Sequence, residues 1–167
     1  MEKVGILSDT HGVFLPQVRR FLEPCAEIWH AGDIGSLALW QEISAFRPTV
    51  AVYGNIDDYV LRRHVPETAV FECQGCKVVL THIGGYPGKY YPDVKKILLR
   101  EKPDIFVCGH SHILKVMRDE RLNLLHINPG AAGNKGFHPI VTAVRMDIDG
   151  KNCSNLEIFE LDRNEIL

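Results

Sequence analysis

The stretch Val4-Gly5-Ile6-Leu7-Ser8-Asp9-Thr10-His11-Gly12 decides the fold, because the rest of the chain repeats its pattern. A short apolar run ends directly in polar residues and a glycine. Such a run, bounded by turn residues, is typical of a buried strand. Residues two apart in an extended segment point to the same side, so Asp9 and His11 can reach one ligand together.

Four further apolar runs end in groups of the same kind. Their ends read His30-Ala31-Gly32-Asp33, Gly54-Asn55-Ile56-Asp57-Asp58, Thr81-His82 and Gly109-His110-Ser111-His112. In open α/β sheets, ligands bind at the carboxyl ends of the strands, so we expect these five segments to meet there. Each motif alone occurs by chance, and Asp or Asn after a strand is commonly a turn residue. Five motifs at the same end of five predicted strands indicate a metal site.

The ligand chemistry narrows the choice of metal. Carboxylate, amide and imidazole groups without thiolate suit Mn²⁺ first, with Fe, Co, Ni or Zn²⁺ as alternatives. We expect Gly12, Gly32, Gly54 and Gly109 to let the backbone turn sharply beside the ions.

The apolar pattern also predicts the architecture. Runs at 4–7, 27–30 and 49–53 read as strands, and helical patterns lie between them, the second capped by Ser36. This alternation implies parallel strands with helical crossovers. A hairpin over 69–82, a helix over 92–101, a strand at 105–108 and antiparallel strands at 114–117, 122–127, 140–146 and 156–159 follow. The predicted fold class is α/β: one domain over residues 1–167, a mixed two-sheet β-sandwich flanked by helices.

Composition excludes some classes of protein. The 167 residues carry a net charge of −2, with 46% hydrophobic and 24% charged residues, which is typical of an ordinary soluble domain. Neither a large nucleic-acid surface nor a membrane surface is expected without a basic excess. No run approaches the ~18 apolar residues of a membrane span, and the first residues lack a secretory signal. We therefore expect a cytoplasmic protein.

The five cysteines include a close pair, Cys73 and Cys76. The pair could be a redox motif or half of a zinc site. We favour a structural interpretation, because Gln74-Gly75 is typical of a hairpin tip and a redox pair would begin a helix. A second cysteine pair, which a four-thiolate zinc site would need, is absent from the sequence.

Taken in order, the five motifs resemble the calcineurin-like metallophosphoesterase superfamily, whose pattern is Asp-x-His, Gly-Asp, Gly-Asn, His and Gly-His-x-His. The small size and the Asn128-Pro129-Gly130 turn resemble its compact YfcE-type phosphodiesterases. The resemblance implies an αββα sandwich and two divalent metal ions. One ion would be held by Asp9, His11, Asp33 and His112, and the other by Asp33, Asn55, His82 and His110. A hydroxide bridging the ions would attack phosphorus.

One position departs from the family pattern. Many members have a histidine between the Asn and the acidic residue of the third motif, where it is thought to assist the leaving group. Here Ile56 stands at that position and cannot move a proton. Asp57 matches the last residue of the motif and is assigned a supporting catalytic role.

The remaining histidines and one loop have weaker claims to the site. His30 could line the site, but we favour a structural role for it. We expect His64 to lie on the surface, His126 to lie in a strand, and His138 to be able to approach the site from a Gly-rich loop. The segment Lys89-Tyr90-Tyr91, in a flexible loop after His82, could contact substrate, but we favour a plain surface loop.

The main functional hypothesis is a phosphodiesterase acting on small, nucleotide-like diesters. A phosphomonoesterase is the alternative on the same site. A protein-binding scaffold of the same fold, as in the retromer subunit, is the alternative outside enzymes. Relatives often form homo-oligomers, so we also expect a dimer.

Overall fold

The first three apolar runs form the parallel half of one sheet. The computed structural model describes residues 1–166, and in it this sheet has the order β12-β11-β1-β2-β3. Its strands are β1 (Glu2–Leu7), β2 (Glu27–His30), β3 (Thr49–Ala51), β11 (Ile140–Asp149) and β12 (Asn152–Asp162). β1, β2 and β3 are parallel, and β11 pairs antiparallel with the other edge of β1. The segment that opens the chain is therefore central in its sheet.

The predicted hairpin and the strand after it form the second sheet, in the order β4-β5-β8-β10-β9. Its strands are β4 (Thr68–Cys73), β5 (Cys76–Thr81), β8 (Ile105–Val107), β9 (Lys115–Asp119) and β10 (Leu124–Asn128). The predicted antiparallel pairing is confirmed for β9 with β10, but β10 also pairs in parallel with β8, with Leu125 opposite Ile105, which was not predicted. The apolar pattern of a strand specifies its faces but not the direction of its neighbours.

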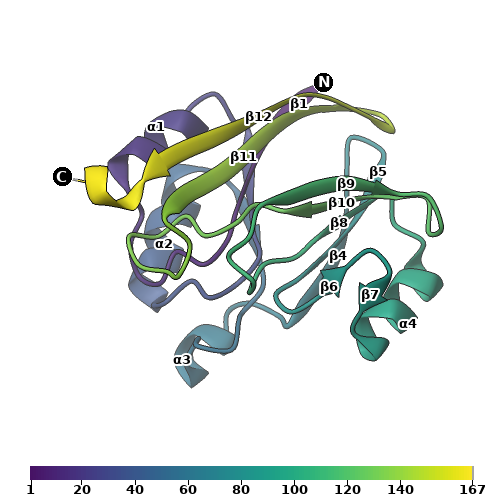
Figure 1. Cartoon of the computed structure of the whole chain (residues 1–167), viewed down its shortest axis with the longest axis horizontal. Helices are drawn as coiled ribbons and strands as arrows, with labels where there is room; N and C mark the ends of the chain where they lie inside the picture. Colours follow the sequence, from purple (N-terminus) through teal and green to yellow (C-terminus); the bar gives the residue numbers. More distant parts are fainter. Residues whose placement is uncertain (167) are drawn as a thin grey trace.

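Helices cover the outer face of each sheet. The helical elements described are α1 (Pro16–Leu22), α2 (Leu37–Phe46), α3 (Tyr59–Arg62), α4 (Pro92–Glu101) and the 3₁₀ turn Arg163–Glu165. α1 and α2 lie beside the first sheet and α4 lies beside the second (Figure 1). The predicted cap of α2 is confirmed, since Ser36 Oγ accepts a hydrogen bond from Leu39 N at 3.1 Å. Among residues 1–166, no helix is long and apolar enough to cross a membrane.

Three apolar layers hold the elements together. Ile6 and Trp29 point into the space between the sheets, where they meet Val78 and Leu80. Leu7 and Ile28 point the other way and pack against α1 and α2. The core under α4 includes Val94, Leu98 and Phe106. The four structural layers are helix, sheet, sheet and helix, so the predicted αββα sandwich is confirmed.

Candidate metal centre

All seven predicted ligands come from loops that follow strands. Asp9 and His11 follow β1, Asp33 follows β2 and Asn55 lies beyond β3, all in the first sheet. His82 follows β5, and His110 and His112 follow β8, in the second sheet. Six of these side chains form two groups of close ligand atoms, which are Asp9, His11 and His112, and Asp33, His82 and His110. The structure thus brings the carboxyl ends of both sheets to one place.

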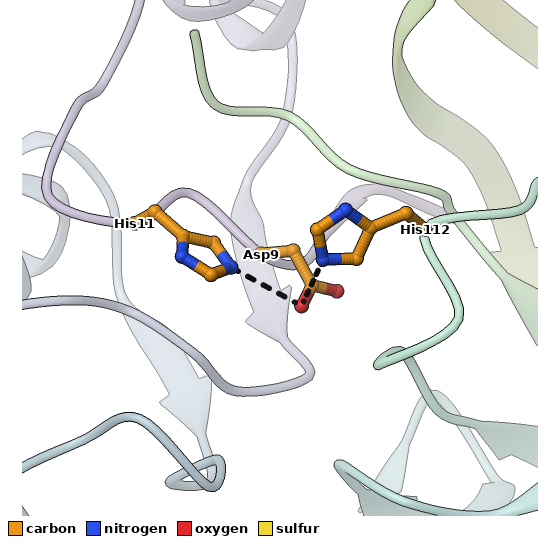
Figure 2. Close-up of side chains that lie close together, drawn as sticks. All are labelled: Asp9, His11 and His112. Carbon is orange, nitrogen blue, oxygen red and sulfur yellow. Dashed lines mark ion pairs between the residues drawn. The ribbon is translucent and has the colours of Figure 1, made fainter. Parts of the chain in front are cut away.

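In the first group the Asp9 carboxylate lies between two imidazoles (Figure 2). Asp9 Oδ1 is 3.7 Å from His11 Nε2 and 3.2 Å from His112 Nε2. Its other oxygen, Oδ2, accepts hydrogen bonds from the Ser8 hydroxyl at 2.6 Å and from His110 N at 3.1 Å. One oxygen is therefore used by the fold and the other faces the histidines.

The second group repeats this division. Asp33 Oδ1 accepts a hydrogen bond from Ile56 N at 3.0 Å, and Oδ2 lies 3.2 Å from His82 Nε2. Asn55 joins this group, because its Oδ1 is 3.0 Å from His82 Nε2 and 3.1 Å from His110 Nδ1. Asn55 was predicted from sequence, and its amide oxygen is a suitable hard ligand.

The two groups adjoin through Asp33. His11 Nε2, from the first group, is 3.6 Å from Asp33 Oδ2. His82 Nε2, from the second, is 3.9 Å from Asp9 Oδ1. Asp33 Oδ2 is therefore close to imidazoles of both groups.

The donor atoms fit a divalent cation. Within residues 1–166, Asp9 Oδ1 and His11 Nε2 are buried and have no hydrogen-bond partner. His82 Nδ1 lies 2.7 Å from the Ala31 carbonyl, which only accepts, so Nδ1 carries the proton and Nε2 keeps its lone pair for the cluster. Buried polar atoms without partners are rare and call for an explanation, and a bound cation would satisfy these.

The protein atoms alone show the same need for positive charge. Burial acts to raise the pKa of Asp9, but the rings of His11, His112 and His82 outweigh it and hold the pKa well below its usual range. The carboxylate of Asp9 raises the pKa of His11. Burial acts to lower the pKa of His82, but Asp33 and Asp9 outweigh it and raise the pKa. Protons on the imidazoles thus compete with a cation for the same carboxylates.

The backbone at the cluster is strained. Five of the predicted ligands have positive φ angles between 48° and 72°: Asp9, His11, Asp33, His110 and His112. Non-glycine residues rarely adopt this conformation, and such residues gather at functional sites. Sequence reasoning did not predict this feature, and a glycine-rich motif gives no signal for which non-glycine neighbour is strained.

Two of the four motif glycines are needed for a different reason than predicted. Gly12 and Gly32 have positive φ angles, as sharp turns require. Gly54 and Gly109 do not have positive φ angles. They are needed because a larger residue would not fit there. A Cβ on Gly54 would lie 2.0 Å from Asp33 Oδ1, and one on Gly109 would lie 2.0 Å from Ser8 Oγ. These glycines let one ligand loop approach the next.

Asp57 holds loops together. Its Oδ2 accepts hydrogen bonds from Gly54 N at 2.8 Å and Ile34 N at 3.1 Å, and its Oδ1 accepts from Gly35 N at 2.8 Å. These contacts join the loop that carries Asp33 to the loop that carries Asn55. They are the contacts of a positioning residue, and its supporting role in catalysis stays a prediction.

His30 is structural, as predicted. It is buried, its Nδ1 accepts a hydrogen bond from Gly32 N at 3.1 Å, and its Nε2 lies 2.9 Å from the Thr10 hydroxyl. Burial lowers the pKa of His30 to about 3, so the ring is neutral near pH 7. It ties the loop after β1 to the loop after β2.

The remaining histidines do not belong to the two ligand groups, although the loop that carries His138 reaches the site, since the ring centres of Phe137 and His112 are 6.1 Å apart. His64 is exposed, as predicted, and its Nδ1 lies 3.0 Å from Val60 O. His138 Nδ1 accepts a hydrogen bond from Ile140 N at 3.2 Å. Lys89 and Tyr90 form β7 (Lys89–Tyr90), which pairs with β6 (Gly85–Tyr86), so the predicted surface loop contains a short two-stranded hairpin.

The Asn128 turn supports the last motif. Asn128 Nδ2 donates to Gly109 O at 3.1 Å and to Ser111 Oγ at 3.0 Å, and its Oδ1 accepts from Gly130 N at 3.0 Å. In the sequence this turn supports only the family resemblance. Its contacts hold the loop that places His110 and His112.

The cysteine pair has the structural role that we favoured. Cys73 and Cys76 are buried and face each other across the β4–β5 hairpin, with Gln74 and Gly75 at its tip. Burial raises the pKa of each thiol to about 12, so both are protonated near pH 7. Protonated thiols are neither good metal ligands nor nucleophiles.

Comparison with known proteins agrees with this geometry. The family model for the calcineurin-like phosphoesterase superfamily domain matches residues 2–151. A probable metallophosphoesterase of Methanothermobacter thermautotrophicus is 29% identical over 137 residues, which cover 77% of this chain and 76% of that protein.

Solved structures share the fold. An archaeal phosphodiesterase superposes with a TM-score of 0.73 and 24% identity, covering 95% of this chain and 99% of that one. Wild-type Vps29 of Entamoeba histolytica, in complex with Zn²⁺, superposes with a TM-score of 0.71 and 19% identity, covering 97% and 99%.

Proposed function

The chain belongs to the calcineurin-like phosphoesterase superfamily, and we propose that it is a metal-dependent phosphodiesterase. The observation that supports this most directly is the convergence of Asp9, Asp33 and four histidines. Each of the two carboxylates has one oxygen anchored by the fold and one directed at imidazoles. Fixed ligands of this kind are typical of sites that must keep their geometry during a reaction.

We assign two divalent ions to the two groups. Asp9, His11, Asp33 and His112 would hold one ion, and Asp33, Asn55, His82 and His110 would hold the other. The position of Asp33 Oδ2, 3.6 Å from His11 Nε2 and 3.2 Å from His82 Nε2, supports its role as the shared ligand. Bound there, the ions would activate water for attack on phosphorus and neutralise phosphate charge. Mn²⁺ is the first candidate.

The protein part of the site contributes orientation and charge balance. Two divalent ions would carry four positive charges, and Asp9 and Asp33 supply two negative charges. The site would therefore keep an excess of positive charge for a phosphate anion. Ser8, His110 N and Ile56 N fix the carboxylates from behind, so the ligands need not reorganise when substrate binds.

Ile56 supports an ester with a good leaving group. Its side chain is 46% exposed next to Asn55 and carries no proton to donate. An ester whose leaving oxygen is already stable as an anion does not need such a proton. This favours activated esters of either kind, and we place diesters ahead of monoesters because a solved structure with the same fold is an archaeal phosphodiesterase.

The test uses bis(4-nitrophenyl) phosphate and 4-nitrophenyl phosphate with Mn²⁺. We expect turnover of the diester to exceed that of the monoester. Asp33→Asn should lower diester kcat/KM by about a hundredfold or more, because a metal ligand is lost. Asp58→Asn is the matched control, since Asp58 only caps α3 through a hydrogen bond from Leu61 N at 2.9 Å.

Metal analysis separates the alternatives. We expect two ions per chain in the wild-type protein and in Asp58→Asn, and fewer in Asp33→Asn. Bound metal with no turnover of either ester would favour the scaffold alternative. Equal background rates in wild type and Asp33→Asn would refute the enzyme, and a higher rate on the monoester would overturn the diester preference.

A further inference from the structure

A side pocket opens beside the metal centre, where the β6–β7 hairpin faces the loop that follows β8. Its volume is about 260 Å³, the space of roughly nine water molecules. His110, one of the candidate metal ligands, lines the pocket, so the pocket reaches the place where we expect the reacting phosphate. Its other lining residues include Ile83, Tyr86, Ser111, Ile113, Lys115 and His126.

Lys115 gives the side pocket its charge. Its Nζ lies 4.7 Å from the centre of the Tyr86 ring, which also lines the pocket, so the ammonium group is held against this wall. Within residues 1–166, no aspartate or glutamate lines the pocket. The lysines that form ion pairs in this part of the chain are Lys3, Lys77 and Lys151, and Lys115 is not among them. A cation without a counter-charge, in a cleft beside a metal centre, favours an anion there.

Ser111 adds a second donor. Its Oγ accepts hydrogen bonds from Asn128 Nδ2 at 3.0 Å and from Ile113 N at 3.2 Å. Because the oxygen already accepts twice, its own hydrogen is left to donate. An ammonium group and a hydroxyl donor together suit a group that only accepts, such as a carboxylate or a phosphate.

His126 is a closed part of the pocket wall. It lies on β10, in a strand as predicted, and its side chain is 0% exposed. Its ring packs between those of Tyr90 and Phe106, with ring centres 5.9 and 5.7 Å away, and neither ring nitrogen has a hydrogen-bond partner within residues 1–166. Burial lowers the pKa of His126 to about 4, so the ring is neutral near pH 7. The positive charge of the wall therefore comes from Lys115 and not from this histidine.

Apolar surface lies between His110 and the ammonium group. Ile83, Tyr86 and Ile113 line the pocket and are 37%, 44% and 54% exposed. Mostly apolar and aromatic walls with a few polar groups are typical of small-molecule sites. These walls suit an apolar spacer that joins a phosphate at the metal centre to an anion at Lys115.

We propose that the side pocket binds the substituent that stays on phosphorus, and that this substituent carries a second negative charge, a carboxylate or a phosphate, on an apolar spacer. The inference rests on the proposed function, since it takes the reacting phosphate to lie at His110. Lys115 Nζ and the Ser111 hydroxyl hold the anion, and Tyr86 covers the spacer. A neutral substituent would leave the ammonium group without a counter-charge, which is why an anionic one fits better.

The kinetic test compares two diesters with the same leaving group and Mn²⁺. They are 4-nitrophenyl 4-carboxybenzyl phosphate and 4-nitrophenyl 4-isopropylbenzyl phosphate, in which the isopropyl group has the shape of the carboxylate without its charge. We expect wild-type kcat/KM to be about tenfold higher for the carboxybenzyl ester, because a charge-assisted hydrogen bond forms. Lys115→Met should remove most of this preference, and Lys115→Arg, which keeps the charge, should retain most of it. Lys95→Met is the matched control, since Lys95 is an exposed lysine of α4 that lines a different hollow, and it should keep the full preference.

A binding test needs no metal and no turnover. EDTA-treated protein is mixed with 4-methylbenzoate, with 4-methylbenzylphosphonate or with neutral 4-methylbenzyl alcohol, and the methyl signals of Ile83 and Ile113 are followed by NMR. We expect at least one of the two anions to shift both signals and the alcohol to shift neither. The anion that acts at the lower concentration distinguishes a carboxylate from a phosphate. The shifts should be lost in Lys115→Met and kept in Lys115→Arg and Lys95→Met, and a dispersed spectrum shows that each variant is folded.

The outcomes separate the two proposals. Turnover of both esters without preference, with no methyl shifts, overturns the pocket and leaves the phosphodiesterase standing. Methyl shifts with no turnover of either ester support the pocket and contradict the proposed activity. A preference that persists in Lys115→Met would show that the metal ions alone attract the anion, and an equal loss in Lys95→Met would show a general effect of surface charge. Either result would also overturn the pocket.

Discussion

At the scale of single residues, the cluster depends on side chains that act behind the ligands. Asp57 is the clearest case, because its carboxylate accepts three backbone hydrogen bonds from two ligand loops while only 3% exposed. A buried acceptor that satisfies three amides is costly to replace, since the amides are then left without a partner.

Asp57→Asn should therefore destabilise the protein and loosen the site. An amide offers one acceptor oxygen in place of two, so at least one backbone amide loses its partner. We expect the free energy of unfolding to fall by about 2–4 kcal/mol in urea titrations. Asp58→Asn, one residue away at a helix cap, should change it by less than about 0.5 kcal/mol. Equal effects of the two substitutions would contradict the positioning role.

His126 makes a prediction about pH. Its pKa is about 4 in the folded protein, against about 6.5 when unfolded. Between these values the unfolded chain binds the proton and the folded chain does not, so stability falls as the pH falls from 6.5 towards 4. The contribution lost between pH 7 and pH 5 is about 2 kcal/mol.

His126→Leu removes that contribution. Both proteins are treated with EDTA, and the free energy of unfolding is measured at pH 7 and at pH 5. The decrease from pH 7 to pH 5 should be about 2 kcal/mol smaller for His126→Leu than for the wild type. Other titrating groups, such as His30 and His11, are common to both proteins and cancel in the comparison. Parallel pH profiles for the two proteins would show that His126 is not buried as a neutral ring.

The identity of the candidate metal ligands was the most predictable part of the site. Asp9, His82 and the other five candidate ligands could be named because each follows an apolar run, and strand ends meet at one edge. The positive φ of His11 and the unpaired nitrogens of His126 could not be predicted. Both depend on how distant segments meet, and no local pattern records that.

At the scale of elements, the ligand loops work because they can approach closely. Gly109 shows this, since a Cβ there would lie 2.0 Å from Ser8 Oγ and 2.9 Å from Asp9 Oδ2. The loop after β8, in the second sheet, therefore packs directly against the loop after β1, in the first sheet. Side-chain volume at this contact would push the first group of ligands apart.

Gly109→Ala should lower metal affinity as well as stability. We expect a loss of about 1–3 kcal/mol in the free energy of unfolding from overpacking. Mn²⁺ affinity measured by calorimetry should fall at least tenfold, because Asp9 and His110 move. Gly88→Ala is the control, because a Cβ there meets no atom within 4 Å. The substitution is instead destabilising because Gly88 has a φ of +89°, which alanine adopts only with strain. It should destabilise the protein and leave metal affinity unchanged; a drop in affinity there too would refute the spacing argument.

Some elements followed their sequence patterns closely, and two short ones were missed. α4 matches its predicted range of 92–101, and the β4–β5 hairpin has its predicted tip. α3, with four residues, and the β6–β7 pair were not predicted. The three-residue strands β3 and β8 were predicted because each lies in an apolar run, whereas α3 and the β6–β7 pair have no such run and are too short to show a period.

At the scale of the whole molecule, the candidate metal centre joins the two sheets. Asp9, His11, Asp33 and Asn55 come from the first sheet, and His82, His110 and His112 come from the second. Ions held by both sets would link two halves that otherwise adhere through the apolar layer between them. We propose that residues 1–167 behave as one domain whose unfolding releases the metal.

This arrangement predicts metal-dependent stability. A ligand that binds only the folded state, present at a hundredfold excess over its dissociation constant, adds about 2.7 kcal/mol to the free energy of unfolding. We therefore expect Mn²⁺ to raise the Tm in a single unfolding transition, and EDTA to reverse it. Asp33→Asn, in the first sheet, and His110→Gln, in the second, should each abolish most of the increase, whereas Asp58→Asn should keep it. If the substitution in one sheet removed the increase and the other did not, the ions would be held by one sheet alone. Two separate transitions would show instead that the sheets unfold as independent units.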